Sequence, residues 1–296
     1  MGQPRTDLAL ESTELWREQT GDPGAASGVI SRERTQEGYP VTVVEITSAE
    51  GERAVNKPMG SYVTLELDGL LERLPEAFPR AARALAAELS PMLRLEEGAP
   101  VLVVGLGNRA ITPDAVGPKA ADHTMVTRHL VDREPEHFGM FRPVAALAAG
   151  VLGTTGMESG ELVHAVVQRV KPACVIAVDA LAARSVKRLC RTIQIASSGI
   201  TPGSGVGNAR KALNQETLGV PVVAVGVPTV VDAATLAADL LGGDSGKGAL
   251  SGAPSLIVTP KDIDSHVADV SKVIGYGINL ALQDGLSVED VDMFLS

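Results

Sequence analysis

The sequence predicts an α/β fold in which a mostly parallel central sheet is covered by helices on both faces. From residue 100 onward, short apolar runs alternate with stretches of helical spacing. These runs are apolar at almost every position, as is typical of parallel strands buried on both sides. The chain has 296 residues, 45% of them hydrophobic and only 3% aromatic, so we expect a substantial core of Val, Leu, Ile and Ala.

The first hundred residues are expected to add a β-hairpin to this sheet. Alternating apolar residues predict strands over 39–47 and 61–67, joined as an antiparallel pair by a Gly/Asn/Pro-containing turn. Residues 70–95 are rich in Ala, Leu, Glu and Arg at helical spacing, and predict an amphipathic helix interrupted near Pro91.

Strands and helices alternate in the remainder of the chain, without an internal repeat. The expected strands cover residues 101–105, 173–178, 192–196, 220–227 and 256–259. The expected helices cover residues 113–131, 155–170, 180–190, 231–241 and 261–284. Residues 242–254 are rich in Gly and Ser and predict a mobile surface loop.

Composition excludes several classes of function. The formal charge of −10 argues against direct nucleic acid binding, which needs clustered Lys and Arg. No apolar run reaches membrane length, and no signal-peptide pattern opens the chain, so no membrane association is expected. Cys174 and Cys190 are expected as reduced core residues of a cytoplasmic protein.

Two aspartates stand where two of the expected strands end. Asp114 follows the strand and glycine turn of 101–108, and Asp179 closes the apolar run 174–178. The carboxyl ends of parallel strands share one edge of a sheet, where ligands and chemistry concentrate. We therefore expect these two carboxylates to meet, although 65 positions separate them.

An acid pair of this kind can hydrolyse a carbonyl compound. Two carboxyl groups in a partly dry cleft cannot both ionise easily, so one keeps a proton near neutrality. The ionised group can activate water, and the protonated group can protonate the carbonyl oxygen or the leaving amine. No Ser or Cys stands in a nucleophile motif.

A purely structural role explains one of these aspartates but not the other. Thr112, Pro113 and Asp114 also match the N-cap, N1 and N2 positions of a helix, which alone explains an acid at this point. A helix start does not explain Asp179, because a carboxylate at the end of a buried strand costs free energy unless it is hydrogen-bonded or functional.

A different class of function starts from the turn after the first expected parallel strand. Gly105 to Ala110 match the G-x-G-x-x-G/A fingerprint of dinucleotide-binding proteins, which leaves open a nucleotide-binding sensor domain that uses the Gly105–Gly107 turn. However, Pro113 stands where the dinucleotide-binding helix should already run, and no acid closes a second strand about 20 residues later. A tight turn that presents Asp114 is the simpler explanation of these glycines.

A second glycine-rich segment, residues 199–208, lacks the Lys-Ser/Thr ending of a phosphate-binding loop. Its glycines would let the main chain approach a bound peptide closely. A third acid, at the strand-to-helix junction near 231, could line the same cleft, although a helix N-cap is its simpler role. The candidate cleft residues are Gly203, Gly205, Gly207, Asn208 and Asp232.

Several blocks along the chain together resemble the germination proteases of spore-forming bacteria. They occur in one order over nearly the whole sequence. The blocks are residues 5–9, 56–58, 103–118, 176–183, 202–208 with Lys211, 226–232 and 257–261. The resemblance implies an endopeptidase that degrades small acid-soluble spore proteins in the forespore and spore core. It also implies an inactive zymogen, a homotetramer, and a phosphorylase/hydrolase-like fold similar to that of hydrogenase-maturation peptidases.

The aspartates proposed as catalytic in this family map onto Asp114 and Asp179. No cofactor is expected on this reading, and the five histidines form no metal motif. The alternative is a metal-dependent peptidase, since acids at similar strand ends hold a metal in the hydrogenase-maturation relatives. Asp114 and Asp179 would then be oxygen ligands of a divalent metal.

The resemblance also implies that the enzyme removes its own N-terminal segment. The family cuts between an acid and an aliphatic residue followed by alanine, and Thr6-Asp7-Leu8-Ala9 fits this pattern with a cut between Asp7 and Leu8. Residues 1–7 would be the prosegment, shorter than expected for the family, and residues 8–296 a single α/β peptidase domain. One departure from the pattern is Thr201, where relatives are expected to carry histidine.

Overall fold

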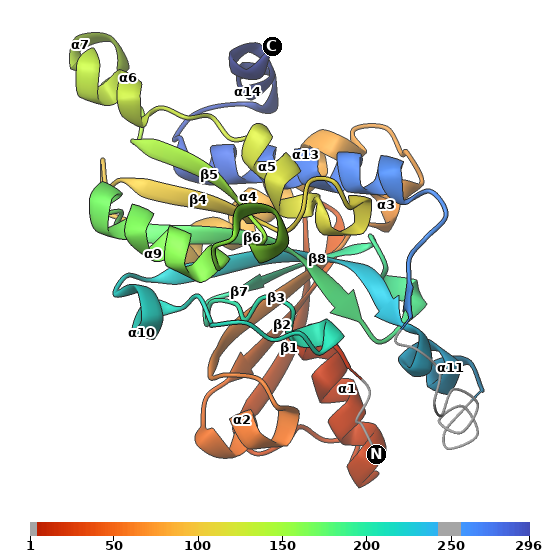
Figure 1. Ribbon diagram of the computed structural model, residues 1–296. Helices are drawn as coiled ribbons and strands as arrows, with labels where there is room; N and C mark the ends of the chain where they lie inside the picture. Colours follow the sequence, from red (N-terminus) through yellow and green to blue (C-terminus); the bar gives the residue numbers. More distant parts are fainter. Residues whose placement is uncertain (1–4, 242–255) are drawn as a thin grey trace.

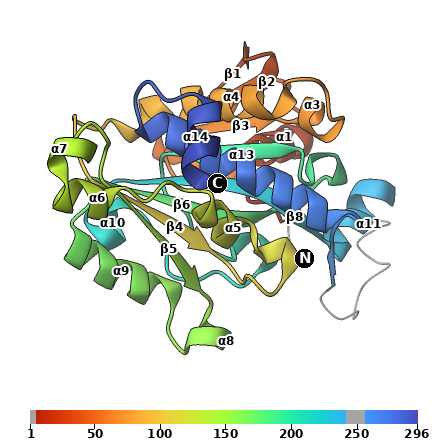
Figure 2. The same ribbon diagram turned by 90° about the horizontal axis from the view of Figure 1, so that it is seen from above.

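A computed structural model describes residues 5–241 and 256–296, in which a central nine-stranded sheet carries helices on both faces (Figures 1 and 2). The expected α/β class is confirmed. The strand order is β1-β2-β3-β7-β8-β6-β4-β5, and β9 pairs with β8. The strands are β1 (Val29–Gln36), β2 (Tyr39–Ile46), β3 (Gly60–Glu66), β4 (Val101–Leu106), β5 (Val144–Gly150), β6 (Cys174–Ala183), β7 (Thr192–Ala196), β8 (Val222–Asp232) and β9 (Ile257–Val258).

The helices connect these strands and cover the sheet. The α-helices are α1 (Ala9–Thr20), α2 (Ala49–Val55), α3 (Asp68–Leu71), α4 (Ala77–Leu93), α5 (Val116–Asp122), α6 (Arg128–Arg133), α7 (Pro135–Phe138), α8 (Leu152–Thr155), α9 (Ser159–Val170), α10 (Gln215–Leu218), α11 (Ala233–Leu241), α13 (Ile263–Leu282) and α14 (Val288–Leu295). The 3₁₀ turns are η1 (Thr112–Asp114), η2 (Val186–Arg188) and η3 (Ser204–Val206).

The sheet is divided into a parallel and an antiparallel part. Strands β5, β4, β6 and β8 run parallel, whereas every pairing that involves β1, β2, β3, β7 or β9 is antiparallel. The sheet is thus mixed, and its parallel character is confined to four strands. The expected strand pair of 39–67 is present as β2 and β3, but α2 lies between them and β3 pairs with β7, so the pair extends the main sheet.

The strand β6 continues further than expected, and this changes the site. It runs to Ala183 because β8 pairs beside it as far as Val231, so the helix expected over 180–190 is absent. Leu181 and Ala183 pack in a small apolar cluster of this strand extension. Asp179 is therefore inside a strand and does not end one.

The two faces of the sheet are covered differently, as Figures 1 and 2 show. One face packs against α4, α5 and α13 in the largest core cluster. On the other face, α9 covers the parallel strands and α1 with α2 covers the antiparallel strands, in two separate clusters. On this second face, the helices over the parallel strands and the helices over the antiparallel strands form separate clusters. The cavities described below lie where these two groups of helices meet, over β6 and β8.

The Gly/Ser-rich loop expected over 242–254 lies outside the described residues. Among the residues that are described, none of the helices has the length and apolar character needed to cross a membrane. Cys174 and Cys190 are both buried and unbonded, as expected.

Candidate active site

Asp179 lies on β6 at the point where the neighbouring strand β4 has stopped. The pairing of β4 with β6 ends at Gly105 and Val178, whereas β6 continues beside β8, with Asp179 opposite Gly226. Alternation along β6 places Val178 in the core under α13, so Asp179 points to the opposite face. Its side chain is buried, with 5% of its surface exposed, and one carboxylate oxygen accepts a hydrogen bond from Ala180 N–H at 2.9 Å.

Asp114 reaches the same edge of the sheet through a glycine turn. Asn108 N–H donates to Asp114 Oδ2 at 2.7 Å. Gly107 has a φ of +107°, and a Cβ at this position would lie 2.1 Å from the main-chain oxygen of Asp114. A Cβ on Gly105 would lie 2.2 Å from the main-chain oxygen of Gly117. The two glycines therefore allow the chain around Asp114 to pack directly against the end of β4.

The local structure around Asp114 differs from the expected helix start. Thr112 begins the 3₁₀ turn η1 whose N-cap is Ile111, and the Thr112 hydroxyl donates to Asp264 Oδ1 at 2.8 Å. The α-helix α5 begins only at Val116. Asp114 is thus held by a turn before the helix.

Asp114 and Asp179 line one cavity of about 430 Å³. Burial, followed by repulsion from Asp114, raises the pKa of Asp179 well above its ordinary value, and the Ala180 N–H only partly opposes this. Burial also raises the pKa of Asp114, whereas Asn108 N–H and the positive charge of Arg210 act to lower it. The two environments thus favour a proton on Asp179 and the charge on Asp114.

Asp7, from the chain's own N-terminal segment, lies in this cavity. Asp7 lines it together with the two aspartates, and its charge contributes to the raised pKa of Asp179. Asp7 Oδ2 accepts a hydrogen bond from Ala182 N–H at 2.8 Å, and Ser204 Oγ–H donates to Asp7 Oδ1 at 2.6 Å. The main-chain N–H of Asp7 donates to Ala182 O at 2.9 Å, so residue 7 is bound beside the free end of β6.

The side-chain amide of Gln194, on β7, holds the peptide on both sides of Leu8. Gln194 Nε2 donates to Asp7 O at 3.2 Å, and Ala9 N–H donates to Gln194 Oε1 at 2.7 Å. Leu8 itself is fully buried in the small cluster that contains Leu181. The bond between Asp7 and Leu8 is thus held in one place by main-chain and side-chain contacts.

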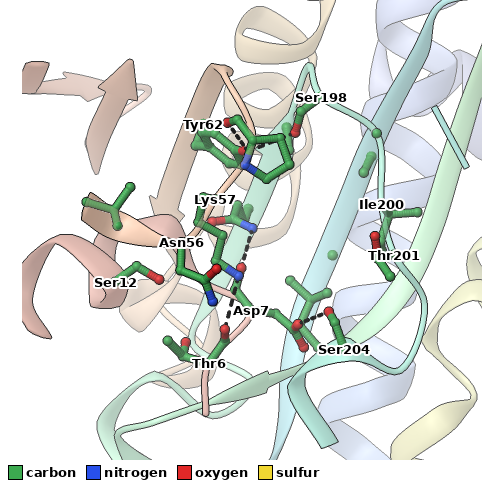
Figure 3. Close-up of a pocket in the computed structure, with 18 of the residues that line it drawn as sticks. Thr6, Asp7, Ser12, Asn56, Lys57, Tyr62, Ser198, Ile200, Thr201 and Ser204 are labelled. Carbon is green, nitrogen blue, oxygen red and sulfur yellow. Dashed lines mark hydrogen bonds between the residues drawn. The ribbon is translucent and has the colours of Figure 1, made fainter. Parts of the chain in front are cut away.

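A second cavity, of about 440 Å³, adjoins the other side of this segment. Figure 3 shows Lys57 reaching to the main chain of Thr6, with Thr201 on the opposite wall. Lys57 Nζ donates to Thr6 O at 3.0 Å, and burial lowers the pKa of this amine while the negative charges of Asp7 and Glu11 oppose the shift. Lys57 thus anchors the peptide one residue before Asp7.

The residues of the glycine-rich segment 203–208 differ in which part of the site they touch. Gly203 and Asn208 line the cavity of the two aspartates. Gly205 and Gly207 lie against the N-terminal segment, since a Cβ on Gly205 would be 2.1 Å from Asp7 Oδ2 and one on Gly207 would be 2.5 Å from the Arg5 side chain. The main chain of this loop therefore approaches residues 5 and 7 closely, and its role toward a substrate stays a prediction.

The expectation that Asp232 lines the cleft is wrong. Asp232 is not among the residues that line either cavity. Its carboxylate accepts hydrogen bonds from the N–H and the hydroxyl of Thr235, at 3.0 and 3.2 Å, at the start of α11. This is the N-cap role that its position at a strand-to-helix junction also allowed.

Sequence reasoning missed Gln194 and Ser204, and gave Lys57 no role of its own. One signal was present for the first, since Gln194 is a long polar residue between the two isoleucines of β7. Ser204 lies in a loop where its contact with Asp7 depends on the fold alone.

This edge of the sheet offers few metal ligands and little space for a nucleotide in the described residues. In the part of the chain that is described, no three His, Cys, Asp or Glu side chains cluster as metal ligands would. The two aspartates could still offer two oxygen ligands from one cavity. The space beside Gly105 and Gly107, where a dinucleotide-binding turn would hold a pyrophosphate, is filled by the chain's own residues 114–117.

The fold is an α/β sheet that carries two carboxyl groups and Asp7 of its own N-terminal segment around one cavity. The family model for germination protease matches residues 9–242, and the chain belongs to this family. It is accordingly a protease of the kind that acts in spore germination.

Relatives support this assignment over the full length. The chain is 44% identical to the germination protease of Caldanaerobacter subterraneus subsp. tengcongensis, over 98% of each chain. It is 37% identical to that of Priestia megaterium, over 97% of this chain and 95% of the relative.

Among solved structures, a [NiFe] hydrogenase maturation protease, HycI, from Thermococcus kodakarensis KOD1 matches 64% of this chain and 98% of its own, at 18% identity and a TM-score of 0.36.

Proposed function

We propose that this chain is an endopeptidase in which Asp114 and Asp179 together direct water onto a peptide carbonyl. The observation that carries the proposal is the shared cavity, which is lined by both carboxyl groups and by Asp7 of the bound N-terminal segment. An acid pair in a cavity that also contains Asp7 can supply both proton transfers that amide hydrolysis needs.

The environments of the two carboxyl groups indicate which of them acts as the general acid and which as the general base. Asp179 is buried and its raised pKa keeps it protonated near neutrality, so it donates a proton to the carbonyl oxygen or to the leaving amine. Asp114 accepts Asn108 N–H and feels the charge of Arg210, both of which favour its ionised form, so it takes a proton from water. Because the groups interact, the pKa values that an experiment observes belong to the pair.

The first bond cleaved is that between Asp7 and Leu8, and the chain is made as a zymogen. The contacts of Asp7 with Ala182 and of Lys57 with Thr6 support this, because they seat residues 6 and 7 where a substrate would have to lie. A site filled by its own chain is closed to other peptides. Cleavage frees residues 1–7 to leave the cavity.

The substrates of the processed enzyme are small acid-soluble spore proteins, and the enzyme works as a homotetramer in the forespore and spore core. Membership of the germination protease family supports these assignments. The contacts of residues 7 and 8 support the substrate assignment alone, since they accommodate an acid followed by an aliphatic residue.

The test replaces Asp114 and Asp179 singly by Asn in a chain that lacks residues 1–7, so that its own segment does not fill the cavity, and measures cleavage of a synthetic peptide with the sequence of residues 5–15. Each substitution removes one proton-transfer group, so turnover should fall by roughly a hundredfold to ten-thousandfold. Wild-type turnover in either variant would refute the acid pair. A parallel series with a chelator, followed by addition of divalent metal, distinguishes the metal-dependent alternative. Loss of activity that metal restores would make the two aspartates ligands.

A further inference from the structure

Both carboxylate oxygens of Asp7 are bound by uncharged donors. Ala182 N–H donates to Oδ2 at 2.8 Å, and Ser204 Oγ–H donates to Oδ1 at 2.6 Å. The donors come from two separate parts of the fold, the free end of β6 and the start of η3. Hydrogen bonds from such donors to a charged acceptor are stronger than those between neutral groups. Together, Ala182 N–H and Ser204 Oγ–H form a binding site for a carboxylate, called the acid seat below.

The space for this carboxylate depends on Gly205. A Cβ at this position would lie 2.1 Å from Asp7 Oδ2 and 2.7 Å from the Ala182 Cβ. Gly205 is buried, and its φ lies outside the left-handed region in which glycine is favoured, so the requirement for glycine here is one of space. The loop is thus shaped around the acidic side chain.

The neighbouring position takes an apolar side chain. Leu8 is fully buried in a cluster formed by Leu181, Ala183, Leu189 and Val231. A seat for an acid therefore lies directly beside a pocket for an aliphatic residue. The Gln194 amide holds the main chain at these two positions through hydrogen bonds with Asp7 O and Ala9 N–H.

We propose that Ser204 Oγ and Ala182 N–H are the donors that select an acidic residue immediately before the cleaved bond. They hold Asp7 during self-processing, and after residues 1–7 have left they hold the corresponding acid of a protein substrate. This inference rests on the proposed cleavage between Asp7 and Leu8. Ser204 is the specificity-determining side chain of the pair, because the Ala182 donor belongs to the main chain.

The test is a double-mutant cycle on the full-length chain, with the first-order rate of appearance of the Leu8 N-terminus as readout. Asp7→Ala and Ser204→Ala should each slow self-processing by roughly tenfold to a hundredfold, the range expected for a hydrogen bond to a charged group. The double variant should be no more than about threefold slower than Asp7→Ala, since Ser204 then has no partner left to lose. Ser204→Thr retains the hydroxyl and should retain most of the rate.

Ser198→Ala is the matched control. Ser198 is in the same loop region and lines the second cavity, but its hydroxyl donates to the Tyr62 hydroxyl at 2.9 Å and makes no hydrogen bond to Asp7. Its effect should be small and independent of residue 7. Ser204 is exposed, so removal of its hydroxyl should lower the melting temperature by only a few degrees.

The outcomes separate this inference from the proposed function. A wild-type chain that never yields the Leu8 N-terminus overturns the proposed cleavage, and the acid seat with it. A chain that is cut at this bond, but in which the Asp7→Ala and Ser204→Ala effects multiply, overturns the acid seat alone. Retention of the full rate by Ser204→Ala has the same consequence.

Discussion

Asp179 and Gln194 lie on one row of the central sheet, with only Gly226 between them. Gly226 pairs with Asp179 of β6 on one side and with Gln194 of β7 on the other. Neighbours on such a row project from the same face of a sheet. The carboxyl group and the amide that holds the peptide main chain are therefore fixed relative to one another by strand register. Gly226 adds no side chain to the space between them, which Leu181 partly fills.

Replacement of Gln194 by Leu should slow self-processing by roughly tenfold or more. The substitution removes the bonds to Asp7 O and Ala9 N–H, and each lost bond with a buried partner left unsatisfied costs about 1–3 kcal/mol. The free energy of unfolding should fall as well. Rates are measured by mass spectrometry of the intact chain, and stability by urea unfolding.

Gln283→Leu is the control for this variant. Gln283 is another buried amide that clamps a main chain, through Arg142 N–H at 2.8 Å and Arg142 O at 3.0 Å, but it lies outside the lining of both cavities. It should lose similar stability and keep the wild-type rate of processing. Equal slowing of both variants would mean that Gln194 acts through stability alone.

Replacement of Gly205 by Ala should displace the N-terminal segment from the cavity. The new methyl group would overlap Asp7 Oδ2, so the amides of residues 7–9 should exchange their hydrogens faster, by roughly tenfold to a hundredfold if the contacts of Asp7 are lost. Gly153→Ala is the matched control, because a Cβ there meets no atom within 4 Å. Unchanged exchange in Gly205→Ala would show that the segment is not seated against this glycine.

Asp179→Asn should stabilise the chain at neutral pH. Because burial and the nearby charge of Asp114 raise the pKa of Asp179, the folded protein retains a proton that the unfolded chain releases above about pH 3.9. Wild-type stability therefore declines as the pH rises from about 4 through the raised pKa, whereas Asn does not titrate. The variant should gain about 0.5–2 kcal/mol at pH 7, and the gain should vanish below about pH 4.

This prediction is checked by urea unfolding of intact chains, verified by mass, from pH 4 to pH 8. A difference between Asp179→Asn and wild type that is constant over this range would contradict a protonated Asp179. Greater wild-type stability at pH 7 would contradict it too.

The sequence was most informative where one physical rule fixes the outcome. Asp114 and Asp179 could be expected to meet because parallel strands end at the same edge of a sheet. The glycines of residues 105–107 and 203–207 could be expected to allow close approach, since only the absence of a Cβ permits it. The catalytic role of the two acids is still a prediction.

Other features depended on strand register and tertiary contacts, which local patterns do not contain. The polar strand β1, with Arg and Glu at its centre, and the Ala-rich strand β5 carry too weak a strand pattern to be recognised. The helix expected over 180–190 was wrong because pairing with β8 keeps β6 extended. Gln194 could not be linked to Asp179 without knowing that Gly226 pairs with both.

The mass of the purified chain after incubation tests the acid pair most directly. Wild type should lose residues 1–7 and begin at Leu8, and the rate should not depend on protein concentration, because Asp7 already lies in its own cavity. Asp114→Asn and Asp179→Asn should both remain at full length under the same conditions. Release of the same segment by either variant at the wild-type rate would contradict hydrolysis by these two aspartates.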